Sequence, residues 1–129
     1  MLLQGLWWTE SGDFDFARKD NWRWTLMIVQ PEHVTEEMVE EARQQVERKK
    51  PNQALSGLRL EGFHEGPSVQ IMHVGPYETE PATVERMHQF ARESGYRLHG
   101  KHHEIYLGDQ RRADPDKLKT VLRQPVEKP

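Results

Sequence analysis

The chain has 129 residues, enough for one compact domain and too few for two independent ones. Its formal net charge of -3 gives no broad basic surface for nucleic acid, and the absence of cysteine excludes disulfides and thiolate chemistry. The N-terminal stretch 1–8 lacks the basic residues and cleavage site of a signal peptide, and no apolar run approaches the ~18–20 residues that cross a bilayer. We therefore expect a single cytoplasmic domain over residues 1–129 that binds neither nucleic acid directly nor membrane.

Two aromatic strands are predicted at the N-terminus, over residues 2–10 (LLQGLWWTE) and 22–30 (WRWTLMIVQ). The polar segment 11–21 joins them as a long-looped hairpin. The continuous apolar run of the second strand predicts burial on both of its faces. Because adjacent strand residues alternate, one of Trp7 and Trp8 must face away from the other, under a partner, a ligand or the Phe-containing loop.

A mostly solvated helix is predicted next. Thr35 is a good N-cap, Val39 and Val46 belong to a narrow apolar stripe, and Pro51 ends the segment. Residues 58–63 (LRLEGF) are predicted to form a strand.

The C-terminal half is predicted to hold a strand, a helix and a hairpin. The first strand is 68–74 (SVQIMHV), and the helix begins near Thr79 and ends before Gly95. Residues 102–107 and 118–126 are predicted to form the hairpin, the latter after a short helical turn. The expected apolar stripe of the helix consists of Val84, Met87, Phe90 and Ala91.

The two predicted hairpins echo each other. TLMIVQP (25–31) and TVLRQP (120–125) are alike, and each follows an aromatic strand and a polar turn. We therefore expect the two hairpins to form two related halves of one domain. Only the C-terminal hairpin has a strand and a helix in front of it.

The stretch KHHEIYL (101–107) carries the candidate chemistry. Glu104 and Tyr106 share one face of their strand, whereas Ile105 is expected to pack under the helices on the other face. A cleft over Glu104 would make it an acid or base, and open solvent would make it an ordinary polar residue. The histidines show no zinc-binding spacing, and no phosphate loop or dinucleotide fingerprint occurs, so we expect neither a metal nor a cofactor.

Three stretches, 24–42, 72–90 and 100–126, together resemble the GyrI-like small-molecule-binding proteins. The specific features are a His-x-Gly-Pro-Tyr step into a helix and the strand motif His-Glu-Ile-Tyr-Leu-x-Asp. The resemblance implies an α+β fold with an antiparallel sheet and helices on one face, built from two strand–helix–strand–strand modules related by a pseudo-twofold. It also places the ligand cleft at the junction, with Glu104 in it.

The stand-alone branch of this family is similar to enzymes described as cyclopropanoid cyclopropyl hydrolases, which detoxify DNA-alkylating compounds in an aromatic cage. By this resemblance Glu104 and Tyr106 are the candidate catalytic residues. The candidate ligand-binding residues are Trp7, Trp8, Trp24 and Tyr77, and Trp7 corresponds to Tyr106 if the hairpins are equivalent. The alternatives are a module that binds without catalysis, sequestering drugs or modulating a partner such as gyrase, and a structural or interaction protein.

The chain departs from this branch in its N-terminal module, where the first strand and helix are missing. Three accounts stay open: a fragment, a short form that dimerises over the gap, or a fold without activity. An apolar hairpin with an open edge favours a homodimer.

Overall fold

The computed structural model describes residues 1–10, 21–109 and 111–129, and these form two compact units. The first unit comprises residues 1–28 and 65–129, and the second comprises residues 29–64. The Phe-containing loop that the sequence offers as a cover for the Trp pair lies outside the described residues.

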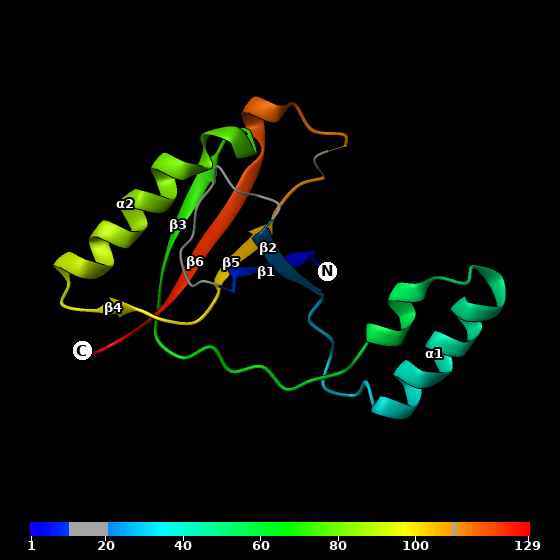
Figure 1. The fold of residues 1–129 in the computed structure, drawn as a ribbon. Helices are drawn as coiled ribbons and strands as arrows, with labels where there is room; N and C mark the ends of the chain where they lie inside the picture. Colours follow the sequence, from blue (N-terminus) through cyan, green and yellow to red (C-terminus); the bar gives the residue numbers. More distant parts are fainter. Residues whose placement is uncertain (11–20, 110) are drawn as a thin grey trace. The chain divides into compact units, whose positions relative to one another are not determined.

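An antiparallel sheet is the framework of the first unit (Figure 1). The strand order is β2-β1-β5-β6-β3, with the short β4 paired to β6. Their bounds are β1 Gln4–Thr9, β2 Trp22–Met27, β3 Ser68–Val74, β4 Arg97–Leu98, β5 His102–Tyr106 and β6 Lys119–Glu127. The predicted α+β fold with two hairpins is confirmed, and β1 joins the hairpins by pairing with β5.

Helix α2, Glu80–Glu93, lies against one face of the sheet beside β3 and β6 (Figure 1). The core forms where Val84 and Met87 of α2 meet Leu122 of β6, with Val69 and Ile71 packed against them. Phe90, expected in the same stripe, is 62% exposed, so that prediction is wrong. The helix ends as predicted, because Gly95 takes the left-handed conformation after the C-cap.

Strand β2 lies at an edge of the sheet, which overturns the prediction that it is buried on both faces. Trp24 is 59% exposed and Leu26 is 55% exposed. An apolar run shows that a segment favours burial, but burial needs elements on both sides. In the described part of the chain, β2 pairs with β1 alone.

The second unit contains α1, Glu36–Lys49, and the 3-10 helix η2, Gln53–Gly57. The Thr35 hydroxyl accepts from the Met38 N–H at 3.2 Å, which confirms the predicted N-cap. Residues 58–63 form no strand, so that prediction is wrong. A strand needs a ladder partner, and here the Leu58 carbonyl instead accepts from the Arg43 guanidinium at 2.7 Å.

Candidate functional site

Glu104 lies on the face of the sheet that α2 covers. It is paired in register with Leu122, which packs against α2, and only 7% of its surface is exposed. The expectation that Ile105 packs under the helices is therefore wrong. The alternation along β5 is as predicted, but the helix covers the polar side of the strand.

The His102 Nε2 donates a hydrogen bond to the Glu104 carboxylate at 2.8 Å. Burial alone would raise the pKa of Glu104, but the hydrogen bond and charge of His102, with smaller contributions from Glu80 and Tyr106, hold it below its ordinary value. Glu104 is thus a buried carboxylate that stays ionised.

Tyr106 links this carboxylate to the aromatic side chains. Its hydroxyl accepts from the Trp7 indole Nε1 at 3.0 Å and donates to Glu104. Burial and the negative charge of Glu104 raise the pKa of Tyr106 far above its ordinary value. The phenol therefore keeps its proton and acts as a hydrogen-bond donor.

Gly5 makes room for this contact, since it is the residue of β1 paired with Glu104. A Cβ at this position would lie 2.7 Å from the Trp7 Nε1 and 3.1 Å from the Tyr106 hydroxyl. Any larger residue would separate the indole from the phenol.

Aromatic rings surround the Trp7–Tyr106 contact. The Trp7 ring centroid lies 5.9 Å from that of Trp22 and 6.0 Å from that of Trp24, while Tyr77 meets Tyr106 edge-to-face at 6.2 Å. Such spacings are those of interacting aromatic pairs. The five rings are called the aromatic cluster below.

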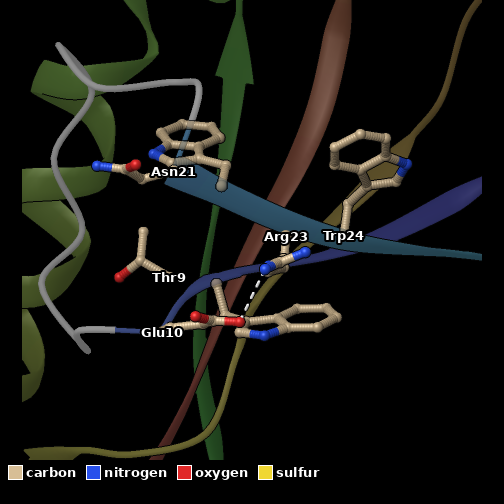
Figure 2. Close-up of a pocket in the computed structure, with 7 residues that line it drawn as sticks. Thr9, Glu10, Asn21, Arg23 and Trp24 are labelled. Carbon is tan, nitrogen blue, oxygen red and sulfur yellow. Dashed lines mark hydrogen bonds and ion pairs between the residues drawn. The ribbon is translucent and has the colours of Figure 1, made fainter.

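Trp8 does not join this cluster. It alternates with Trp7 along β1, and the Lys101 ammonium lies 3.7 Å from its ring centroid. A hollow of about 660 Å³ opens at the end of the β1–β2 hairpin, lined by Trp8, Trp22 and Trp24 among others. Figure 2 shows Trp24 and the Glu10–Arg23 ion pair of this hollow on opposite sides of β2. The hollow thus adjoins the aromatic cluster through Trp22 and Trp24.

The turn before α2 positions Tyr77, which begins the 3-10 helix η3, Tyr77–Thr79. Buried His73 fixes this turn: its Nε2 lies 3.0 Å from the Pro76 carbonyl oxygen and its Nδ1 lies 2.7 Å from the Thr83 hydroxyl. Because a carbonyl only accepts, Nε2 carries a proton and donates to the Pro76 oxygen. The His-x-Gly-Pro-Tyr motif is therefore a rigid link that aims Tyr77 at Tyr106.

The side chains of the two adjacent histidines of β5 lie on opposite faces of the sheet, as the alternation along a strand requires. His102 joins Glu104, whereas the His103 Nδ1 lies 3.0 Å from the Glu65 carboxyl and its Nε2 lies 2.8 Å from the Gln4 Oε1. Among the residues that the structure describes, no three acidic or histidine side chains are grouped as metal ligands.

Sequence reasoning missed Glu80, His102 and Trp22. Glu80 opens a helix, where an acidic residue is ordinary, so no local signal marks it. The histidines are weighed in the sequence only as metal ligands, although the position of His102 two residues before Glu104 places the two on one face of the strand. Trp22 can be placed beside Trp7 only when the register between β1 and β2 is known, and the sequence does not reveal that register.

The fold and this buried carboxylate beside aromatic rings define a small-molecule-binding domain. The chain belongs to the GyrI-like family: the family described as "GyrI-like small molecule binding domain" matches residues 5–127. No functionally curated protein matches it.

Solved structures from Listeria innocua share the fold. One, described as an uncharacterized conserved protein, is 47% identical with a TM-score of 0.89, covering 98% of this chain and 65% of that one. Two described as hydrolases are 44% and 42% identical, with TM-scores of 0.84 and 0.81, covering 98% of this chain and 64% of theirs. The chain thus spans less than two thirds of the length of these structures. In the described ranges, no helix has the length and apolarity to span a membrane.

Proposed function

We propose that this chain binds flat hydrophobic xenobiotics, including cationic ones, against the aromatic cluster, with Glu104 at the base of the site. The observation that carries the proposal is the junction of a buried, ionised carboxylate with five aromatic side chains through the Trp7–Tyr106 hydrogen bond. Stacking contributes roughly 0.5–1.5 kcal/mol per aromatic pair beyond the buried area, and the carboxylate attracts a cation.

The proposed activity is hydrolysis of cyclopropanoid DNA-alkylating compounds, which would detoxify them in the cytoplasm. The family membership and the two relatives described as hydrolases support it. In this reaction water bonds to a cyclopropane carbon, the strained carbon–carbon bond breaks, and its electron pair moves to the conjugated carbonyl oxygen. Glu104 orients the water and accepts its proton, and Tyr106 hydrogen-bonds the oxygen that gains the electron pair after its hydroxyl turns from Glu104 to the ligand. The proton on Glu104 then passes to that oxygen, so the product is the substrate plus one water.

One observation favours a non-catalytic binding module as the second candidate. The lowered pKa of Glu104 makes the carboxylate a weak proton acceptor while leaving it well suited to hold a cation. In this case the protein sequesters the compound or modulates a partner.

Turnover separates the two candidates. The protein is incubated with a cyclopropanoid alkylator while the ultraviolet spectrum is followed. Catalysis consumes more than one equivalent, whereas sequestration stops at stoichiometric quenching of tryptophan fluorescence. Under the hydrolytic proposal, Glu104→Gln loses turnover and Glu78→Gln, a change of an exposed carboxylate beside Tyr77, retains it. Turnover that survives Glu104→Gln intact would refute the catalytic assignment.

We also propose that the chain forms a homodimer. The place of β2 at the edge of the sheet, among the strands that the structure describes, and the exposed side chains of Trp24 and Leu26 support this, because an edge strand with apolar residues is a template for a second strand. Sedimentation equilibrium tests it: Leu26→Lys should shift the protein toward the monomer, and an unchanged wild-type monomer at all concentrations would reject the dimer.

A further inference from the structure

We infer that His73 is a positioning residue of this site, which holds the Tyr106 phenol in place through the peptide group that precedes Tyr77. The contacts that make up this link belong to the protein without ligand. Their use in hydrolysis rests on the proposed function, in which the Tyr106 hydroxyl hydrogen-bonds an oxygen of the ligand.

The Pro76 carbonyl oxygen is the centre of the turn between β3 and α2. Three donors lie within hydrogen-bond distance of it: the His73 Nε2 at 3.0 Å, the Thr79 hydroxyl at 2.9 Å and the Thr79 backbone N–H at 3.2 Å. This oxygen belongs to the planar peptide group that joins Pro76 to Tyr77. Fixing the oxygen therefore fixes the plane from which the Tyr77 side chain departs.

His73 ties this peptide group to the sheet and to α2. It lies on β3, is 5% exposed, and has its Nδ1 2.7 Å from the Thr83 hydroxyl of α2. An imidazole held at both nitrogens cannot rotate without losing a hydrogen bond in a buried place, which is costly. Gly75 adds a third tie, since its N–H donates to the Leu118 carbonyl at 2.8 Å from a backbone with a φ of 131° that favours glycine.

Tyr77 passes this order on to Tyr106. The two rings meet edge-to-face, with centroids 6.2 Å apart and an angle of 89° between their planes. Tyr106 is the last residue of β5, and Gly108 two positions later has no side chain to pack beside it. Contact with Tyr77 therefore limits the movement of the ring whose hydroxyl accepts from the Trp7 indole at 3.0 Å.

The inferred role differs from a purely structural one at a single place. A histidine that only joined β3 to α2 would stabilise the fold and leave the Tyr106 ring where it is. A positioning residue acts on the reaction without touching the ligand, because a phenol that stabilises a developing negative charge must lie at a fixed point before the reaction begins. The two roles therefore separate in the contact between Tyr77 and Tyr106.

Nuclear magnetic resonance of the protein without ligand tests this contact. The chain has three tyrosines, so in protein whose tyrosines alone carry ring protons the Tyr77 and Tyr106 rings should give a through-space cross-peak, assigned by its loss in Tyr77→Phe. His73→Leu should lose the cross-peak. His73→Gln keeps a nitrogen donor toward the Pro76 carbonyl and should retain it. His64→Leu, which changes an exposed histidine, is the control and should also retain it.

Three results would overturn the inference: no cross-peak in the wild type, an undiminished cross-peak in folded His73→Leu, or equal loss in His73→Leu and His73→Gln. Backbone amide spectra verify that each variant is folded. If His73→Leu does not fold, Thr83→Val decides: it removes the hydroxyl beside Nδ1 with little change of shape and should weaken the cross-peak, and an unchanged cross-peak overturns the inference. None of these results depends on whether flat compounds bind.

Kinetics tests the consequence for the proposed reaction. If the wild type turns over an alkylator, His73→Leu should lower kcat about tenfold, because a phenol displaced by ~1 Å donates poorly, and His73→Gln should restore most of it. In a Tyr77→Ala background, His73→Leu should lower kcat no further, since it acts through Tyr77. Losses that multiply would overturn the inference. No turnover by the wild type would reject the hydrolysis instead, and the cross-peak then decides the role of His73.

Discussion

Glu104 takes its character from neighbours in three different elements. His102 and Tyr106 come from its own strand, Glu80 from α2, and Trp7 reaches it from β1 through the Tyr106 hydroxyl. A strand with two polar residues on one face would be solvated in isolation. Here the chain places a helix over that face and supplies enough donors to keep the carboxylate charged, which is the condition for a site that attracts cations.

Gly5→Ala tests the closeness of this arrangement. The added methyl group would lie within 2.7 Å of the Trp7 Nε1, so the indole must move and the Trp7–Tyr106 hydrogen bond is lost. We expect a loss of about 1–3 kcal/mol in the free energy of unfolding, measured by urea denaturation. Gly108→Ala is the matched control, since nothing lies within 4 Å of its added Cβ. Equal stability of the two variants would show that a Cβ at Gly5 does not disturb the Trp7–Tyr106 hydrogen bond.

At the level of elements, α1 depends on its cap more than on packing. None of its residues is buried, so the Thr35 hydroxyl bond and the charges at its ends contribute a large share of its stability. Thr35→Ala should cost ~1 kcal/mol and speed amide hydrogen exchange in the first turn, while Thr35→Ser should keep the protection. If exchange in the two variants is the same, the cap does not hold the helix.

The elements that could be predicted are those with local causes. Thr35, Gly95 and the alternation of β5 act within a few residues, and the structure confirms all three predictions. The burial of β2 and a strand at 58–63 were wrong, because both depend on neighbours that sequence periodicity does not reveal. The candidate site shows the same division: Glu104 and Tyr106 stand out in one strand, whereas Glu80 joins them only through the packing of α2.

The whole molecule should lose stability on acidification. The pKa of His88 is lowered by burial and by the charge of His102, and that of Glu104 is lowered by His102 and the other donors despite its burial. For both groups the unfolded chain binds more protons than the folded chain. The free energy of unfolding therefore decreases as the pH is lowered. The stability contributed by His88 should be lost as the pH falls below 6.5, the ordinary pKa of a histidine. The stability contributed by Glu104 should be lost as the pH falls below 4.5, the ordinary pKa of a glutamate.

Denaturation with urea across this pH range tests the assignment. His88→Gln should flatten the upper part of the curve and leave the lower part, while Glu104→Gln should flatten the lower part. His33→Gln serves as the control, because His33 is exposed. A wild-type stability that rises or stays constant on acidification would contradict the account.

The most direct test of the central claim is calorimetric titration of a planar aromatic cation and its neutral analogue of the same shape. If the buried carboxylate beneath the aromatic cluster binds such compounds, Glu104→Gln should weaken the cation about tenfold, ~1.4 kcal/mol, and the neutral analogue far less. Trp7→Ala should weaken both ligands. Equal affinity of wild type and Glu104→Gln for the cation, or binding unaffected by Trp7→Ala, would contradict the account.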